Sequence, residues 1–135
     1  MDPQLAFLQS NTFAVAGASN NRDKYGNRVF RALVDFTAAD DSRAVYPIHP
    51  ALETVEGRDA FARLADLPTV PDALSIITPP AVTKVIVQEA IAAGVKRIWM
   101  QPGAEHPDAI TDAEEAGISV LAGGPCILVA LITLV

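Results

Sequence analysis

Short apolar runs, each closely followed by glycine or proline, recur along this chain and constrain its fold more than any other feature. The runs occupy residues 12–16, 44–46, 73–77, 96–100 and 118–121. Short apolar runs bounded by turn-forming residues are typical of strands that are buried on both faces. We therefore expect a central sheet whose two faces are both covered.

Segments with helical periodicity lie between these runs. In the first of them Val29, Leu33 and Phe36 recur at spacings of four and three residues, which places them on one helix face. The other predicted helices cover residues 60–67, 82–91 and 108–116, with Pro68, Gly94 and Gly117 as their respective stop signals. Residues 37–43 are polar and are interpreted as a loop.

The alternation of strand and helix predicts an α/β fold. We expect a single Rossmann-like, doubly wound domain over residues 1–135, with a five-stranded, mainly parallel sheet and helices on both faces. Half of the residues are hydrophobic and 19% are charged, which is enough apolar material for a packed core and excludes a disordered chain.

Charge and cysteine content exclude several classes of protein. The net charge of −6 argues against a general nucleic-acid-coating protein and against a basic protein that binds membrane surfaces, so neither nucleic acid nor a membrane is expected as a partner. The single cysteine excludes an internal disulfide and a multi-cysteine metal site, and no metal site is expected. Residues 1–10 lack the layout of a signal peptide, and the apolar stretch 126–135 is too short to span a bilayer. We expect a soluble, cytoplasmic protein.

The loop after the first predicted strand is the best candidate for a ligand site. In parallel sheets, ligands bind beyond the carboxyl ends of the strands. Gly17 allows a ligand to approach the backbone, and Ser19, Asn20 and Asn21 offer hydrogen bonds from their side chains. The N–H groups at the start of the next helix favour an anion, so phosphate is the expected guest.

The glycine spacing departs from the pattern of dinucleotide-binding loops. After Gly17 the next glycine is Gly26, so the GxGxxG motif is absent. The second predicted strand is followed by Pro47, Ile48, His49 and Pro50, with no acidic residue before Glu53 to bind ribose hydroxyls. Both departures disfavour NAD. An NAD(P)-binding oxidoreductase or a redox-sensing module remains the alternative function.

Basic residues gather just after this loop. Four of them, and one acidic residue, lie within positions 22–31 of a chain that is acidic as a whole. Such a cluster matches a ligand with several phosphates, although a solvated helix face is the alternative interpretation. The basic residues are Arg22, Lys24, Arg28 and Arg31.

The segment 17–26 is similar to the first loop of the small single-domain CoA-binding proteins. Their fold is shared with the N-terminal domain of the succinyl-CoA synthetase alpha subunit. The resemblance rests on Gly17–Asn21 with Lys24–Gly26, and it continues through residues 46–50, 64–68, 99–104 and 124–127. It covers roughly residues 5 to 130.

The resemblance implies that coenzyme A or an acyl-CoA binds at the strand ends. Gly17, Ala18 and Ser19 would lie against the pyrophosphate, with Lys24 as the charged partner of a phosphate. His49 stands where the family usually has asparagine. The full candidate binding set is Gly17, Ala18, Ser19, Asn20, Arg22, Lys24, Pro47, His49, Ile77, Thr78, Pro79 and Pro80, of which the last four would line the adenine and pantetheine side.

No catalytic constellation is evident. Ser19 lacks a GxSxG context. Glu114 and Glu115 are adjacent in the sequence, so their side chains diverge on a helix and do not form a paired acid–base site. The resemblance implies that a ligase would need a further domain carrying a phosphohistidine, and 135 residues leave no room for one. We therefore expect non-enzymatic binding of coenzyme A.

Three side chains have competing interpretations. Cys126 is predicted to start a helix near the thiol end of coenzyme A, where a mixed disulfide could form, or else to be a small buried hydrophobe. His106, which precedes Pro107, is interpreted as structural, and Trp99 mainly as a core residue. The apolar tail 127–135 makes a homodimer a further expectation.

Overall fold

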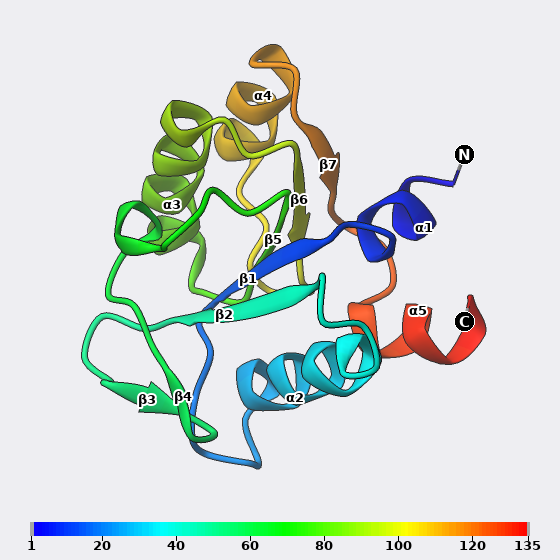
Figure 1. Ribbon diagram of the computed structural model, residues 1–135. Coiled ribbons are helices and arrows are strands. Elements are labelled where there is room, and N and C mark those ends of the chain that lie inside the picture. Colours follow the sequence, from blue (N-terminus) through cyan, green and yellow to red (C-terminus); the bar gives the residue numbers. More distant parts are fainter. Residues whose placement is uncertain (1, 135) are drawn as a thin grey trace.

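The computed structural model describes residues 2–134, so Met1 and Val135, the ends of the predicted domain, lie outside the described residues. Its centre is a five-stranded sheet with the order β2-β1-β5-β6-β7, in which every neighbouring pair is parallel (Figure 1). This confirms the predicted α/β fold. The strands are β1 (Thr12–Ala16), β2 (Ala44–Ile48), β5 (Ala73–Ile76), β6 (Arg97–Met100) and β7 (Ser119–Leu121).

Helices cover both faces of the sheet, as expected for a doubly wound fold. α1, α2 and α5 pack on one face, and α3 and α4 pack on the other (Figure 1). The chain adds β2 on one side of β1 and then β5 on the other, so the strand order reverses between β1 and β5. The helices are α1 (Pro3–Leu8), α2 (Tyr25–Thr37), α3 (Pro80–Ala93), α4 (Pro107–Glu115) and α5 (Ile127–Thr133).

Alternate residues of β1 belong to two separate hydrophobic cores, one on each face of the sheet. Phe13 and Val15 point to the α1–α2–α5 side, and Ala14 and Ala16 point to the α3–α4 side. On the first side the Trp99 ring meets the edge of Phe7, with ring centroids 5.2 Å apart. Trp99 is thus a core residue, as predicted, and its indole N–H donates to the Pro125 carbonyl at 3.2 Å.

β2 is two residues longer than predicted, because Pro47 does not end it. The Pro47 carbonyl points away from β1 and accepts a hydrogen bond from the Phe61 N–H at 3.0 Å. The nitrogen and the carbonyl of one strand residue point to the same edge. The missing N–H of Pro47 therefore removes no bond to β1, and proline is tolerated on this edge strand.

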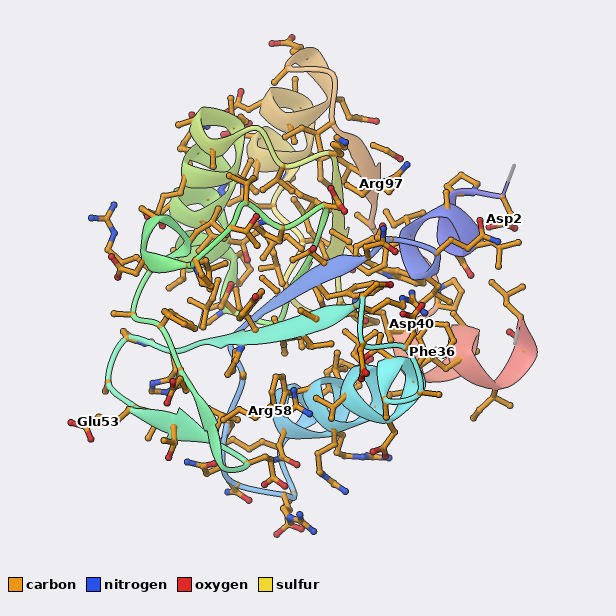
Figure 2. All side chains as sticks on the ribbon, in the orientation of Figure 1. Asp2, Phe36, Asp40, Glu53, Arg58 and Arg97 are labelled. Atoms are coloured by element: carbon orange, nitrogen blue, oxygen red, sulfur yellow. The ribbon has the colours of Figure 1, made fainter. Side chains whose placement is uncertain are left out.

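The predicted helix at residues 60–67 is wrong. A short hairpin, β3 (Thr54–Val55) with β4 (Arg58–Asp59), precedes this segment, and only a 3₁₀ turn, η1 (Leu64–Asp66), forms within it. Phe61 is extended and pairs with Ile48 at the outer edge of β2. Figure 2 shows Glu53 and Arg58 around this hairpin, on the opposite side of the view from Arg97.

Capping residues define the helix ends. Gly94 ends α3 with a φ of +86°, and Gly117 follows α4, so both predicted stop signals are confirmed. The His106 ring nitrogen Nδ1 accepts hydrogen bonds from the Asp108 and Ala109 N–H groups, which confirms the predicted structural role. The Asp2 carboxylate caps α1 in the same way.

The predicted loop begins one residue later than expected, at residue 38, because Thr37 is the buried last residue of α2. Asp40 accepts from the backbone and side chain of Ser42, and Figure 2 shows Asp40 beside Phe36. The Arg43 guanidinium lies over the Phe36 ring, 4.9 Å from its centroid.

The last helix is apolar on its exposed face as well as on its buried face. α5 buries Ile127 and Ala130 but leaves Ile132 80% exposed and Val129 half exposed. The homodimer expected from this tail stays a prediction. None of the helices within residues 2–134 is long and apolar enough to cross a membrane.

Candidate ligand-binding site

A cavity of about 600 Å³ opens at the carboxyl ends of β1, β2 and β5. It lies where the strand order reverses, which is the ligand position of doubly wound sheets, and its volume is within the range of small-molecule sites. Eight predicted site residues line it: Gly17, Ala18, Ser19, Lys24, His49, Ile77, Thr78 and Pro79.

Two glycines allow the parts of this site to approach one another. A Cβ on Gly17 would lie 2.0 Å from the Ile77 carbonyl oxygen, and Gly17 also has a φ of +93°. A Cβ on Gly26 would lie 2.0 Å from the Gly17 carbonyl oxygen. The glycines therefore bring the end of β1, the end of β5 and the start of α2 into backbone contact. Approach of a ligand to Gly17 stays a prediction.

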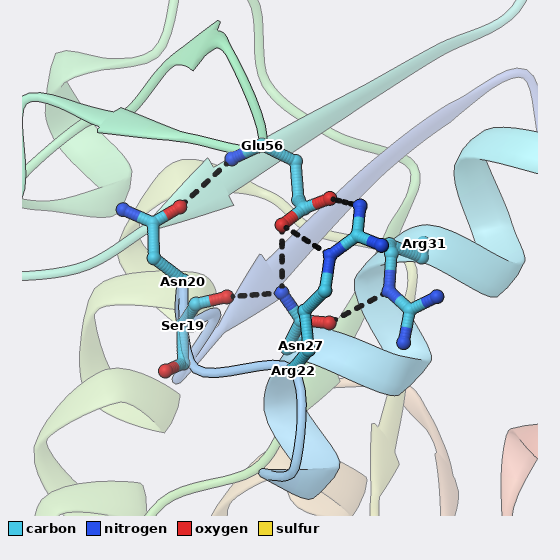
Figure 3. A network of polar contacts seen from close by, with 6 residues as sticks. All are labelled: Ser19, Asn20, Arg22, Asn27, Arg31 and Glu56. Atoms are coloured by element: carbon cyan, nitrogen blue, oxygen red, sulfur yellow. Dashed lines mark hydrogen bonds and ion pairs between the residues drawn. The ribbon is translucent and has the colours of Figure 1, made fainter.

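Asn20 connects the β1 loop to the β3–β4 hairpin instead of lining the cavity. Its side-chain amide donates to the Thr54 carbonyl at 2.9 Å. The same amide accepts from the Glu56 N–H, also at 2.9 Å (Figure 3). The nitrogen and the oxygen of the Asn20 amide thus both bind the β3–β4 turn. Glu56 adopts a φ of +49° at that turn, which a non-glycine residue rarely does.

The Glu56 carboxylate joins the hairpin to α2 (Figure 3). Arg22 donates to both of its oxygens, at 2.6 and 3.4 Å. The buried Asn27 side chain donates to Glu56 at 3.2 Å and to the Ser19 carbonyl at 2.7 Å, and Asn27 accepts from Arg31 at 2.7 Å. These hydrogen bonds hold the backbone of the β1 loop in place.

The network changes the interpretation of the basic window at residues 22–31. Arg22 and Arg31 line a second, smaller polar cavity with Glu56. Of the four basic residues in this window, all in the described part of the chain, Lys24 alone lines the large cavity. Arg22 is therefore a neighbour of the site that positions the loop, and the structure does not bring it into the cavity.

The same carboxylate predicts a dependence of stability on pH. Hydrogen bonds from Arg22 and Asn27 hold the pKa of Glu56 below its usual value. The ionised carboxylate thus stabilises the fold above the ordinary glutamate pKa, and this contribution disappears as pH falls through the folded-state pKa. We expect Glu56→Gln to unfold at lower urea concentration than wild type at neutral pH, with a difference that shrinks in acid.

The matched control is Glu53→Gln, which alters an exposed glutamate on the same segment. Urea titrations from pH 7 down to pH 3 should give Glu53→Gln the wild-type profile. A pH-independent difference between Glu56→Gln and wild type would contradict the role of the ionised carboxylate.

Pro47 and Pro80 also lie outside the lining of the cavity. Pro47 belongs to the outer edge of β2, and Pro80 is the first residue of α3. His49 does line the cavity, and its Nδ1 accepts hydrogen bonds from the Ala51 and Leu52 N–H groups at 3.0 and 3.2 Å. The neutral ring then carries its proton on Nε2, which is available as a donor.

Sequence reasoning missed one wall of the cavity. Val82, Val85 and Ile86 of α3 line it, although their apolar stripe is typical of a core-facing helix. Val85 is 62% exposed, whereas Val87 and Ala90 of the same helix are buried. Tyr25, Arg63 and Glu89 were also missed, and no local pattern in the sequence distinguishes them.

Gln101 lies beneath the site as a fully buried hub. Its Oε1 accepts from the Tyr25 hydroxyl at 3.3 Å and from the Ile127 N–H at 3.0 Å, and its Nε2 donates to Ser75 Oγ at 3.3 Å. Because Tyr25 lines the cavity, the hub connects the cavity wall to β5 and to α5.

Cys126 precedes α5 as its N-cap residue and does not line the cavity. Burial raises the pKa of its thiol, but the nearby Tyr25 hydroxyl and the backbone N–H groups at the start of α5 outweigh burial and lower the pKa overall. Burial, with Cys126 nearby, raises the pKa of Tyr25. A mixed disulfide at Cys126 stays a hypothesis.

The fold and the cavity together define a Rossmann-like α/β protein with a cavity at the switch point of the sheet. The chain belongs to the CoA binding domain family, which matches residues 11–132.

Similar proteins are found among curated proteins and among solved structures. The acetate–CoA ligase (ADP-forming) II subunit alpha of Pyrococcus furiosus is 30% identical over 92 residues, which are 68% of this chain and 19% of that subunit. This chain therefore spans about a fifth of that curated relative. Among solved structures, cell-free ID.343 from Thermus thermophilus is 30% identical with a TM-score of 0.86, each chain covered completely. A hypothetical protein from Pyrococcus horikoshii OT3 is 26% identical with a TM-score of 0.88, with 98% of this chain and 90% of that chain covered.

Proposed function

We propose that this chain binds coenzyme A or an acyl-CoA in the cavity at the ends of β1, β2 and β5, and performs no chemistry on it. Membership of the CoA binding domain family supports coenzyme A as the ligand. The observation that carries the proposal is that the start of α2, beside Gly17, lines the cavity.

The anion site that we propose at this helix start is formed mainly by backbone. Lys24 is the N-cap residue of α2, and no side chain caps the helix there. The N–H groups of the first turn are therefore left for a ligand, and together with the helix dipole they favour a phosphate. The Lys24 ammonium adds a full positive charge at the same place. A pyrophosphate bound here lies along Gly17, Ala18 and Ser19.

The opposite wall of the cavity suits the uncharged part of the ligand. Ile77 and Pro79 after β5, with Val82 and Val85 of α3, present apolar surface. Such a wall binds the methylenes and methyl groups of a pantetheine arm by removing them from water. The two sides thus match a ligand that is anionic at one end and largely apolar at the other.

Two side chains that could take part in catalysis are already engaged. Ser19 Oγ accepts the Asn21 N–H at 3.0 Å, and His49 Nδ1 accepts two backbone N–H groups. A nucleophile needs a base within hydrogen-bond reach, and the contacts of these two side chains are to backbone. This supports a binding module.

Titration calorimetry with coenzyme A, acetyl-CoA, NAD⁺ and NADH tests the proposal. We expect binding of coenzyme A and acetyl-CoA with similar affinity, and no heat with NAD⁺ or NADH. The residues at the end of β2 that line the cavity, Ile48, His49 and Pro50, offer no carboxylate for ribose hydroxyls. Binding of NADH without binding of coenzyme A would replace the proposal with the NAD(P) alternative.

Lys24→Ala is expected to weaken binding of coenzyme A about tenfold, because one charge-assisted contact to phosphate is lost. The dependence of the dissociation constant on salt should also decrease. The matched control is Lys96→Ala at the amino end of the sheet, where Lys96 lies 3.9 Å from Asp72. If both variants bind as wild type does, Lys24 has no part in the site.

A further inference from the structure

One ion pair forms part of the lining of the large cavity. Arg63, just before η1, donates from Nε and from a terminal nitrogen to the same oxygen of Glu89 on α3, at 3.1 and 2.9 Å. Both residues line the cavity. The Arg63 side chain is 66% exposed, and that of Glu89 is 22% exposed. The ion pair thus links the segment that follows the hairpin to α3 at the wall of the cavity.

The position of Arg63 is set by the outer edge of β2. Phe61, two residues earlier, pairs with Ile48 at the last position of that strand. The following Leu64 is buried, so the chain is anchored on both sides of Arg63. This arrangement places Arg63 in the same cavity as the end of β2, where a doubly wound fold places the ribose of a bound nucleotide.

The charges near this ribose position are suited to a phosphate. Glu89 is the one carboxylate among the described residues that line the cavity, and Arg63 already neutralises it. Lys24 lies at the other end of the site, beside Gly17. In this fold an acidic residue at the end of the second strand selects an unmodified ribose, whereas an arginine nearby accommodates a ribose phosphate.

We propose that Arg63 recognises a phosphate monoester on the ribose of the ligand, and that Glu89 holds Arg63 until the ligand arrives. This inference rests on the proposed function, because coenzyme A carries a 3′-phosphate on its ribose. A guanidinium has five N–H donors, of which Glu89 engages two. The remaining donors of this largely exposed guanidinium can form charge-assisted hydrogen bonds to a phosphate dianion, and its ion pair with Glu89 is weak enough to let the side chain turn toward one.

The test compares coenzyme A with 3′-dephospho-coenzyme A by titration calorimetry. We expect wild type to bind coenzyme A about tenfold more tightly, since the phosphate adds charge-assisted hydrogen bonds. In Arg63→Gln the two affinities should become equal through loss of affinity for coenzyme A, with that for the dephospho form unchanged. Glu89→Gln should strengthen coenzyme A binding, because it removes the competing carboxylate.

Arg97→Gln is the matched control, since Arg97 begins β6 at the amino end of the sheet, whereas the cavity lies at the carboxyl ends of the strands (Figure 2). It should keep the wild-type preference for coenzyme A. An unchanged preference in Arg63→Gln would overturn the role of Arg63 while leaving the proposed function intact. Failure of wild type to bind either form would instead overturn the proposed function.

A second pair of ligands distinguishes the source of the ribose phosphate. NADP⁺ and NAD⁺ also differ by one phosphate monoester on a ribose. If wild type binds NADP⁺ but neither form of coenzyme A, and Arg63→Gln loses that binding, Arg63 keeps its role and the proposed ligand is wrong. Equal binding of NADP⁺ and NAD⁺ by wild type, without binding of coenzyme A, overturns both proposals.

Discussion

Gly17→Ala is expected to destabilise the protein by roughly 3 kcal/mol and to abolish ligand binding. The new Cβ would lie 2.0 Å from the Ile77 carbonyl oxygen, which belongs to the backbone and cannot rotate away. The φ of +93° adds strain for any residue with a side chain. Overpacking costs ~1–3 kcal/mol and backbone strain a similar amount. Urea unfolding gives the loss of stability, and calorimetry gives the loss of binding.

Two other glycines separate these two costs. Gly94 has a φ of +86°, and an added Cβ would have nothing within 4 Å, so Gly94→Ala measures strain alone, about 1–2 kcal/mol. Gly26 has the close contact, 2.0 Å to the Gly17 carbonyl oxygen, without a positive φ. Gly26→Ala therefore measures the close contact alone. If Gly17→Ala loses no more stability than Gly94→Ala, the contact between the β1 and β5 loops is unimportant.

The second large effect is expected from Gln101→Leu, which keeps the approximate size of the side chain and removes its polar atoms. The Ile127 N–H and the Ser75 hydroxyl would lose their partner in a region without access to water, since all three residues are buried. Unsatisfied buried groups cost ~1–3 kcal/mol each, so we expect a loss of roughly 3 kcal/mol. Urea unfolding measures it.

The structure also predicts which helix is loosened most by Gln101→Leu. The Ile127 N–H begins α5, so α5 should loosen first, and its amides should exchange with solvent faster than those of α3. Cys126, the N-cap residue of α5, should then react faster with a thiol reagent, and as the single cysteine it gives a clean signal. Gln88→Leu, which removes an exposed side chain that donates to Asp112, is the control and should change neither measurement. Equal thiol reactivity in Gln101→Leu and wild type would contradict the hub.

The strands and three of the helices could be predicted because their information is local. An apolar run ending at Gly17 or a stripe ending at Gly94 is visible within a few residues. The segment at 60–67 misled for the opposite reason. Ala60, Leu64 and Leu67 have the spacing of a helix face, but the pairing of Phe61 with Ile48 is a contact between distant parts of the chain, and it overrides the local pattern. Asp2 followed by Pro3 is a start signal for α1 that is recognisable in the sequence, although no helix was predicted there.

The residues of the candidate site also fall into two sets: those that a local pattern predicts, and those whose position depends on contacts distant in sequence. The loops at the ends of β1 and β5 follow from the fold class, and six of the residues expected there line the cavity. Arg22 was assigned to the ligand because it is basic and close to Gly17 in sequence. Its partner Glu56 is 34 positions away, so nothing local reveals that this charge is already neutralised. A separation of 26 positions hides the pair of Arg63 and Glu89 in the same way.

The amide of Asn20 gives the hairpin an influence that its position would not suggest. Because Asn20 binds the turn at both ends of its side chain, the β1 loop and the hairpin behave as one mechanical unit. Ligand affinity is then open to tuning from β3 and β4, which contribute no residue to the lining of the cavity. Loop grafting onto another scaffold would have to carry both segments, and relatives that differ in this hairpin would differ in affinity even with identical cavity residues.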